Sequence, residues 1–552
     1  MPLTATTSTT AAGVQFFLDG QPLGFGFTPD AGAGTSFSFA AYGTLDGGWS
    51  TSAVANGNHE LSCRGWSSAG LGEVGAVTPV AVGNRSRAQL TTPADQVEVG
   101  GVVEVTAVFS GPQLPTAATF RMDDEILGTG ECSSGPRHTA VCTYAWDSVA
   151  TTTLNHWDMP GGLRVLTAEA TIGGQTVRTQ PVRSIVNIRS DAEMLLSEYE
   201  MAGLGRVGRD GGWSITLPGD PTKDFITFGD GIYRPITGPQ KAEDAVGRWG
   251  NTSVVTESGT GLYGLLNEVP NRTNDPVNAP ALTTVKPAPG VLKNEDGTDC
   301  SEEGGLAWST GVVPKPNSDH VLMTYWGMCS RPGDWPLLQV FGIADWDPVT
   351  NEAVMHNVFV KAADAPGNEH LPSQMQLASP STDGDYLYFW RPDAGALYLA
   401  RVKIPTSGDA EPWTDPSEYE YRNVEAPGGW KADPLAATNL MPETSLGGNV
   451  DSVLRATNLP GQPWLMITHP DSWDTGIVNV YLADEPGAPW RPVPEWQNLV
   501  LCESCGHAWE NGIYVVYSHP ERSTAFELLF TFSDRTTGRV MQKTLPIPAS
   551  MR

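Results

Sequence analysis

The chain has 552 residues and a mass of 58.9 kDa, with 61 Gly, 44 Pro and a formal net charge of −29. This length exceeds one ordinary domain, and we expect about three domains. The glycine and proline content, without a collagen repeat, predicts a turn-rich, all-β fold. The negative charge argues against nucleic acid and anionic lipid as partners, and no window holds the ~18 apolar residues that membrane insertion requires.

The N-terminal segment, residues 1–12, is rich in Thr, Ala and Ser and has little to bury. We therefore expect a flexible arm there. The segment lacks the basic and apolar regions of a secretory signal peptide. Two explanations stay open: a leader has been removed, or the protein leaves its cell by another route, such as a virus particle released by lysis.

Two β-sandwich modules are expected next, over residues 13–84 and 85–189. Short apolar or alternating runs separated by turn residues are typical of sandwich strands. The clearest runs are residues 14–20, 58–66, 101–110, 118–122, 140–146 and 163–172. A strand with Asp-Gly, a W-S-T-x-x-V-x-N-G-x-H-x-L segment and a glycine-rich strand follow one another in the first module. This order resembles the bacterial immunoglobulin-like modules found in secreted enzymes and phage tail proteins.

Residues 190–203 are predicted to form a helical linker. Ser190 can cap the helix, and Glu193 stands three residues later, as a capping box requires. We expect this helix to pack on the following domain rather than to act as a stiff spacer.

Residues 204–552 contain an internal repeat that predicts a five-bladed β-propeller. An apolar, aromatic segment recurs five times, and the last four copies are each followed by a second predicted strand. The five segments are residues 262–268, 321–327, 386–393, 464–471 and 513–521. Units of roughly 60–75 residues fit propeller blades better than a sandwich.

A predicted hairpin near the start of this domain carries two aspartates. Its strands, WSITL and FITF, are joined by a Pro/Gly/Asp turn, with Asp210 just before the first strand and Asp230 just after the second. A hairpin brings these two ends to one edge, so both carboxylates face one location. Glycoside hydrolysis uses such a pair: one carboxyl group protonates the leaving oxygen, and the other activates water or attacks the sugar. The alternative is that both are turn residues, since Asp-Gly pairs are common in turns.

The segment 208–231, with 250–255, resembles the opening blade of a five-bladed propeller family associated with actinobacterial and phage endo-D-arabinanases, which cut the D-arabinan of mycobacterial cell walls. Residues 480–490, 509–521 and 527–530 resemble the end of the same domain. The resemblance covers residues 204–552 and implies that Asp210 and Asp230 are the catalytic pair. The sequence departs from the family where Gly231 replaces the more usual Thr and where an insertion separates the first two blades, so the exact glycan stays open.

Further side chains are candidates for substrate binding. Glu443 precedes a Gly-Gly-Asn turn and Glu268 ends a blade segment, so either could be a third acid facing the axis. Tryptophans near strand ends could stack on sugar rings, or they could pack between blades. The predicted substrate-binding set is Asn251, Glu268, Trp326, Glu443, Trp473 and His519.

The cysteines suggest disulfides rather than a metal site. Cys502-x-x-Cys505-x-His507 has ligand residue types, but no second pair completes four ligands. The pairs Cys132–Cys142, Cys300–Cys329 and Cys502–Cys505 are either disulfides or free thiols, with Cys63 left over. We expect no cofactor, and a structural Ca²⁺ in the propeller channel stays open as an alternative.

The pair of acids favours a glycoside hydrolase, and the family resemblance implies that it cleaves furanose polysaccharide of the actinobacterial envelope. The expected partners are this cell-wall polysaccharide and, through the N-terminal part, other phage tail proteins. The expected location is the tail tip of a virion, with secretion as the alternative. A non-catalytic adhesin or structural tail protein that binds cell-wall glycan is the competing interpretation, and the presence of both acids favours the enzyme.

Overall fold

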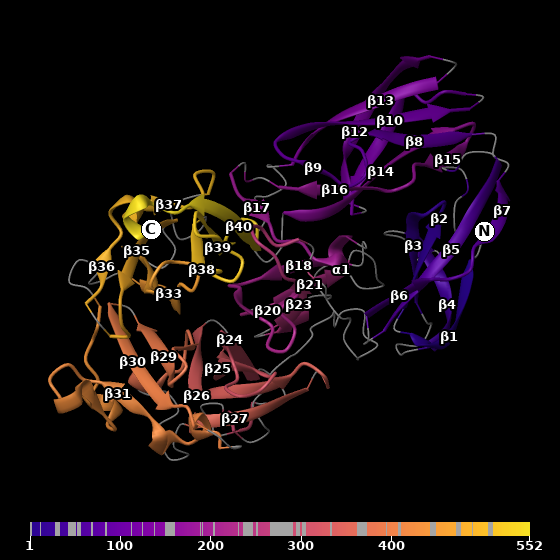
Figure 1. Cartoon of the computed structure of the whole chain (residues 1–552). Helices are drawn as coiled ribbons and strands as arrows, with labels where there is room; N and C mark the ends of the chain where they lie inside the picture. Colours follow the sequence, from indigo (N-terminus) through magenta and orange to yellow (C-terminus); the bar gives the residue numbers. More distant parts are fainter. Residues whose placement is uncertain are drawn as a thin grey trace.

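The computed structural model is nearly all-β. It describes every residue of the chain except 1–2, 12, 28–33, 42–50, 52–53, 55–56, 68–69, 83–85, 112, 124, 137–138, 149–160, 188, 190, 202–204, 230, 236–246, 250–251, 265, 267–290, 294–297, 301–304, 332–333, 351, 361–372, 394, 407–409, 442–448, 471–475, 488 and 506–511. Two sandwich modules precede a five-bladed propeller, so the predicted fold class is confirmed. Figure 1 shows the blade sheets following one another around a common centre, with the two modules to one side.

The first module is a seven-stranded sheet with the order β1-β4-β3-β2-β5-β6 and β7 paired to β5. Its strands are β1 (Thr4–Ala11), β2 (Gly13–Leu18), β3 (Gln21–Phe27), β4 (Gly34–Ala41), β5 (Gly57–Ser67), β6 (Gly70–Val74) and β7 (Thr78–Val82). The prediction of a flexible arm over residues 1–12 is wrong for the described residues 3–11, because β1 pairs with β4 and Leu3, Ala5 and Ala11 are buried. The polar composition of this segment hid the fact that its small side chains meet the module core.

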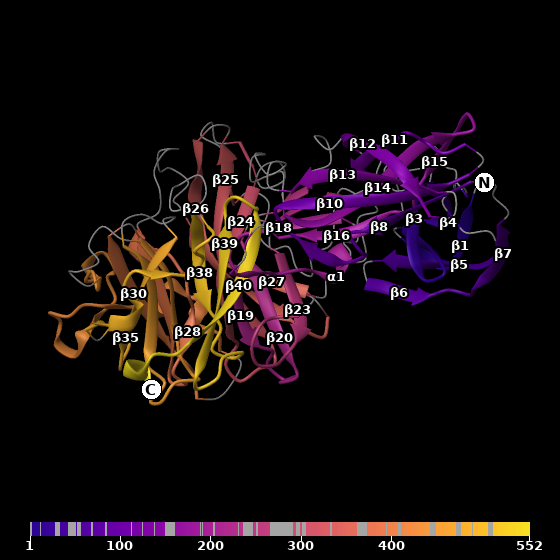
Figure 2. The ribbon, with the colours of Figure 1, turned by 90° about the horizontal axis from the view of Figure 1, so that it is seen from above.

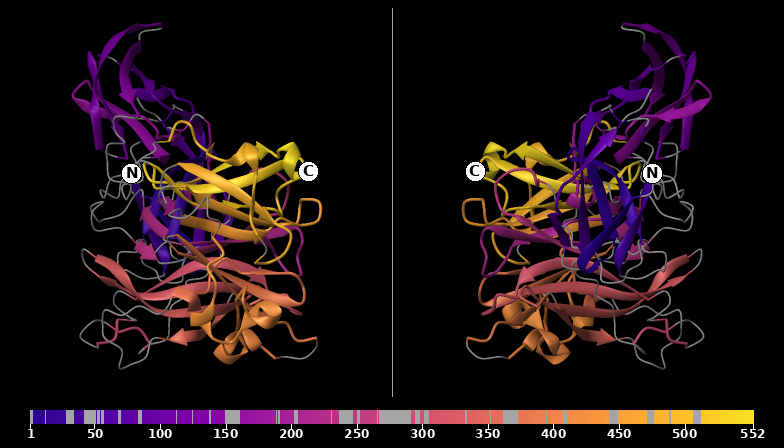
Figure 3. Two further views of the ribbon diagram at one scale, coloured as in Figure 1. Left: turned by 90° about the vertical axis from the view of Figure 1, so that its left-hand side faces the viewer. Right: turned by 90° about the vertical axis from the view of Figure 1, so that its right-hand side faces the viewer.

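The second module is a nine-stranded sheet with a separate core around Phe109, Phe120 and Trp146. Its strands are β8 (Arg87–Thr92), β9 (Val97–Val99), β10 (Val102–Ser110), β11 (Ala117–Met122), β12 (Glu125–Gly135), β13 (Thr139–Asp147), β14 (Gly162–Ile172), β15 (Gln175–Arg178) and β16 (Val182–Val186). Cys132 and Cys142 face each other on β12 and β13 and form a disulfide. Figures 2 and 3 show this module projecting beyond the propeller.

The propeller blades are five successive antiparallel sheets. They contain β19 (Trp213–Thr216), β20 (Lys223–Phe228) and β23 (Thr252–Glu257) in blade 1; β24 (Gly305–Pro314), β25 (Val321–Arg331), β26 (Asp334–Asp347) and β27 (Glu352–Val360) in blade 2; β28 (Ser381–Thr382), β29 (Tyr386–Asp393), β30 (Ala396–Lys403), β31 (Glu420–Arg422) and β32 (Trp430–Lys431) in blade 3; β33 (Asn449–Arg455), β34 (Trp464–His469), β35 (Ile477–Ala483), β36 (Arg491–Pro492) and β37 (Leu499–Val500) in blade 4; and β38 (Ile513–Ser518), β39 (Glu527–Asp534) and β40 (Arg539–Pro546) in blade 5. The first strand of each blade is the inner one, and inner strands line the central channel of a propeller.

The predicted helical linker is largely wrong. Residues 193–194 form the short strand β17 (Glu193–Met194), which pairs with β40 and completes blade 5, and among the described residues of this segment only α1 (Glu198–Met201) is helical. The isolated pattern favours a helix, but blade 5 offers an unpaired strand edge. Glu200, on α1, binds buried Arg539 of β40 at 2.5 Å and fixes this arrangement.

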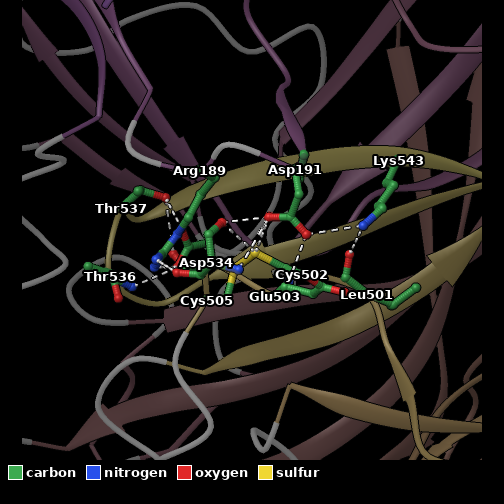
Figure 4. The surroundings of a disulfide bond; sticks show 12 residues. Arg189, Asp191, Leu501, Cys502, Glu503, Cys505, Asp534, Thr536, Thr537 and Lys543 are labelled. Carbon is green, nitrogen blue, oxygen red and sulfur yellow. Dashed lines mark hydrogen bonds and ion pairs between the residues drawn. A yellow bond between two sulfur atoms is a disulfide. The ribbon is translucent and has the colours of Figure 1, made fainter. Parts of the chain in front are cut away.

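The junction between the second module and the propeller is a polar cluster around a disulfide (Figure 4). Arg189 binds Asp534 at 2.7 Å and also donates to the Ser504 carbonyl. The Asp191 carboxylate accepts from the Glu503 amide at 2.7 Å and from the Ser504 hydroxyl at 2.6 Å. It also pairs with Lys543, and the loop that it holds is closed by the disulfide Cys502–Cys505. Arg189 and Asp191 thus tie the second module to blade 5.

All three cysteine pairs that the sequence left open as disulfides or thiols are bonded, since Cys300–Cys329 is also formed, and Cys63 is free. No helix among the described residues has the length and apolar character that crossing a membrane demands.

Candidate active site

The predicted hairpin is present and is interrupted at Asp210. Strand β18 (Gly205–Arg209) pairs with β21 (Gly231–Pro235), which also pairs with β22 (Gly247–Trp249), while β19 pairs with β20. Arg209 faces Gly231, and the Gly229 amide donates to the Asp210 carbonyl at 2.7 Å. Gly229 and Gly231, the neighbours of Asp230, therefore lie across the hairpin from Asp210 and Arg209, respectively. Asp230 itself lies outside the described residues.

Glycine at position 211 is required by this interruption. Gly211 has φ of +76°, and a Cβ there would lie 2.9 Å from the Trp213 ring and 3.1 Å from Val515. Only glycine fits this combination of backbone conformation and close approach. The chain can therefore leave the hairpin plane directly after Asp210, which stays partly exposed.

The Asp210 carboxylate is held by blade 5. The Tyr514 hydroxyl, on the inner strand β38, donates a hydrogen bond to Oδ1 of Asp210. The Gly211 amide donates to the Ser533 hydroxyl on β39 at 2.8 Å. A hydroxyl donor stabilises the ionised carboxylate, which is the form that acts as base or nucleophile.

Three inner strands are irregular, and the irregular stretch of β38 begins at Tyr514, which holds this carboxylate. Their pairing registers shift around Thr310 in β24, Asp451 in β33 and Val515–Val516 in β38. In blade 3, Ser379 precedes β28 with φ of +41° and donates its amide to the Thr310 carbonyl at 2.9 Å. Bulges and unfavourable backbone conformations concentrate next to functional sites, so this end of the channel is the candidate site.

Asp451 is a further acid in this wall. Its Oδ2 accepts from the Val516 amide of the neighbouring blade at 2.9 Å and lies 2.8 Å from Nε2 of His469. Sequence reasoning missed both Asp451 and Tyr514. It placed a third acid at Glu443, which lies outside the described residues, whereas Asp451 lies near the start of the inner strand β33.

Most of the predicted substrate-binding residues lie outside the described residues: Asn251, Glu268, Glu443 and Trp473. Trp326 is described and partly buried on β25. Its Nε1 donates to the Leu377 carbonyl at 3.1 Å, and the Arg391 guanidinium lies 5.3 Å from its ring centroid. These contacts place Trp326 between blades 2 and 3 as a packing residue.

His519 is completely buried in the seam between blades 5 and 1. Its Nδ1 lies 2.5 Å from the Ser214 hydroxyl and 2.9 Å from the Tyr263 hydroxyl, and its Nε2 lies 2.7 Å from the Thr531 hydroxyl. Both ring nitrogens are thus occupied by protein groups, so the side chain holds the seam and does not meet substrate in this conformation. Burial, followed by the charge of Glu521, raises the pKa of Tyr263 well above its usual value, so this hydroxyl stays protonated.

The seam network contains serine, histidine and glutamate but cannot act as a nucleophilic triad. Ser214 and Glu521 both approach Nδ1 of His519, and Ser214 is 2% exposed. A triad needs the base and its orienting acid on opposite ring nitrogens and an accessible hydroxyl. In the described part of the chain, no three His, Cys, Asp or Glu side chains converge as metal ligands.

No family model and no curated protein matches this chain. Among solved structures it is similar to a candidate hydrolase from Bacteroides ovatus, with 14% identity and a TM-score of 0.38 over 62% of this chain and 87% of that one. It is similar to the GH43_1 enzyme from Xanthomonas citri complexed with xylotriose, with 11% identity and a TM-score of 0.30 over 63% and 90%. Fibronectin(III)-like modules of Clostridium thermocellum CbhA match with 16% identity and a TM-score of 0.14 over 34% and 85%.

Proposed function

We propose that this chain is a glycoside hydrolase that cleaves furanose polysaccharide, the D-arabinan of the actinobacterial cell envelope. The observation that carries the proposal is the partly exposed Asp210, held by Tyr514 at the interrupted end of the inner strands. The substrate class comes from the resemblance of residues 204–552 to endo-D-arabinanases.

In this proposal Asp210 and Asp230 are the catalytic pair. The Tyr514 hydroxyl favours an ionised Asp210, which would be the base that activates water or the nucleophile that attacks the sugar. The second acid would protonate the leaving glycosidic oxygen. The hairpin supports the pairing because Gly229 and Gly231, on either side of Asp230, pair with Asp210 and Arg209.

The test is incubation of the protein with mycobacterial arabinogalactan, followed by chromatography of released arabino-oligosaccharides. Asp210→Asn and Asp230→Asn should each lower kcat by about 10²–10⁴-fold, because an amide cannot ionise. Asp220→Asn is the matched control, since Asp220 lies in the turn of the same hairpin and bonds Thr222 and Lys223. Binding without any released sugar would replace the enzyme by the adhesin, and full activity in both amide variants would refute the catalytic pair.

We also propose that the carrier of this activity is a phage tail tip, with secretion as the alternative. The two sandwich modules support this because they can hold the propeller at a distance from an attachment point. Immunogold labelling of the source virion with an antibody to residues 204–552 should mark the tail tip. Labelling absent from virions and present in culture medium would favour secretion.

A further inference from the structure

Two side chains of blade 4 hydrogen-bond the backbone of one residue of blade 5, Val516, in the channel wall. Oδ2 of Asp451 accepts from the Val516 amide at 2.9 Å, and the Ser452 hydroxyl donates to the Val516 carbonyl at 2.9 Å. Asp451 and Ser452 lie in the irregular stretch of β33, and Val516 lies in the irregular stretch of β38. The conformation of the second stretch is therefore set by the first.

His469 in turn fixes Asp451. The imidazole is completely buried, with Nδ1 2.9 Å from the Ile477 carbonyl and Nε2 2.8 Å from Oδ2 of Asp451. A carbonyl oxygen only accepts, so Nδ1 carries a hydrogen. When Nε2 is also protonated, the imidazole and the Asp451 carboxylate form an ion pair. The Asp451 side chain is 7% exposed, so its contact with His469 is shielded from water.

The contacts of Val516 affect Asp210 through the two preceding residues of β38, Val515 and Tyr514. Val515 has φ of +51°, a conformation that a β-branched residue adopts only when its surroundings impose it. Val515 approaches Gly211, which follows Asp210 directly, and Tyr514 donates to the Asp210 carboxylate. A shift of the Val516 peptide would therefore move both groups that hold the acid.

We propose that Asp451 and His469 are positioning residues of the active site, which keep the Tyr514 hydroxyl on Asp210 by fixing the irregular stretch of β38. The proposal rests on the proposed function only where it treats Asp210 as catalytic. The alternative, a purely structural pair, would affect stability without affecting Tyr514.

The kinetic test compares graded variants. Asp451→Ala and His469→Leu should lower kcat by about 10–100-fold with KM changed less than about threefold, because misplacement of a catalytic group acts on the reaction rather than on ground-state binding. Asp451→Asn and His469→Gln should recover most of this loss, since Asn keeps an acceptor for the Val516 amide and Gln keeps a donor for Asp451. His519→Gln is the matched control, a buried histidine outside the channel whose replacement should leave kcat unchanged in the folded fraction.

The second test does not need activity. The protein is labelled with 3-fluorotyrosine, and the ¹⁹F resonance of residue 514, among 14 tyrosines, is the one absent from Tyr514→Phe. Asp451→Ala and His469→Leu should shift this resonance, and His519→Gln should not. An unchanged resonance in both channel variants, or an equal shift in His519→Gln, would overturn the proposal. If the wild-type protein releases no sugar, the proposed function fails, and the resonance alone still decides whether the pair positions Tyr514.

Discussion

His469 and His519 occupy nearly the same local sequence, His-Pro-Asp and His-Pro-Glu, and both side chains are completely buried. His469 ends the second strand of blade 4, beside the first residues of its inner strand. His519 follows the inner strand of blade 5, at the far end of β38 from Tyr514. One histidine therefore lies in the channel wall beside an acid, and the other lies in the seam that closes the ring.

The difference teaches that a recurring motif does not fix its position within a blade. Residues 464–471 and 513–521 were predicted to be equivalent, but they contain the second strand of one blade and the inner strand of the next. The first predicted copy, residues 262–268, is not a strand in its described part, where Leu266 forms only an isolated bridge with Ser197. What separates the two histidines is their surroundings, and the predictions below act on those surroundings.

The largest expected effect on stability is at the seam. Arg522 binds the buried Asp224 of blade 1 at 2.8 Å and donates to three carbonyl groups, those of Glu257, Gly261 and Leu262. Arg522→Leu should lower the free energy of unfolding by about 3–5 kcal/mol, because it leaves a buried carboxylate without its cation. Thermal unfolding followed by tryptophan fluorescence measures the loss.

The loss of stability caused by Arg522→Leu should depend on pH. Burial, and after it the charge of Glu521, raises the pKa of Asp224 above 3.8 even with Arg522 present. An acid whose pKa is raised by folding destabilises the folded protein as the pH rises from the unfolded-state pKa of the acid through its folded-state pKa. The destabilisation by Arg522→Leu should therefore be larger at pH 7 than at pH 4, and the opposite order would show that Asp224 does not depend on Arg522.

The next effect separates the two histidines. His519→Leu should cost about 2–3 kcal/mol, because the hydroxyls of Thr531 and Ser214 lose buried partners at about 1–3 kcal/mol each when they cannot re-pair. Activity per folded molecule should be unchanged, whereas His469→Leu should lower kcat. Thermal unfolding and assays on the same preparations measure both quantities. Equal kinetic losses in the two variants would remove the distinction between seam and channel.

The features that sequence predicted are those with local signals. Alternating strands and turn residues predicted the all-β class and the hairpin beside Asp210, and the repeat of aromatic segments predicted the five blades. The spacing of cysteines indicated the three pairs that are bonded, without deciding between disulfides and thiols. The strand β1 was missed because Thr and Ala are poor indicators of burial, and β17 was missed because the helix pattern is overridden by pairing with β40.

The parts of the site that sequence could not predict depend on contacts between blades. Tyr514 stands within the stretch that resembles the family, yet nothing local says that its hydroxyl meets a residue about 300 positions earlier, Asp210. Asp451 has the residue type and the strand position of a site residue. Its role depends on Val516 and His469, which only the closed ring brings to it.

The junction with the second module is a third polar cluster, and its effect should be smaller than that of the seam. Although burial opposes it, hydrogen bonds from Ser504, Glu503 and Lys543 lower the pKa of Asp191 to about 2 from 3.8. An acid whose pKa is lowered by folding contributes stability at pH values above its unfolded-state pKa. This contribution is lost as the pH falls through its folded-state pKa. Asp191→Asn should therefore cost about 2 kcal/mol at pH 7 and little at pH 2. A loss that does not depend on pH in urea titrations would show that the carboxylate charge is not what holds the loop.

The smallest effect is expected at the rim of blade 4, which has an ion pair without burial. Arg491 binds Asp484 at 2.6 Å, with 61% and 79% of their side chains exposed. Such pairs contribute about 0.5 kcal/mol or less, because water screens the charges and both side chains lose freedom. Asp484→Asn should therefore leave the unfolding temperature and kcat within error at 0.15 M salt. A loss of stability comparable to that of Asp191→Asn would mean that exposed and half-buried acids stabilise this propeller equally. Burial would then not distinguish its polar clusters from its surface ion pairs.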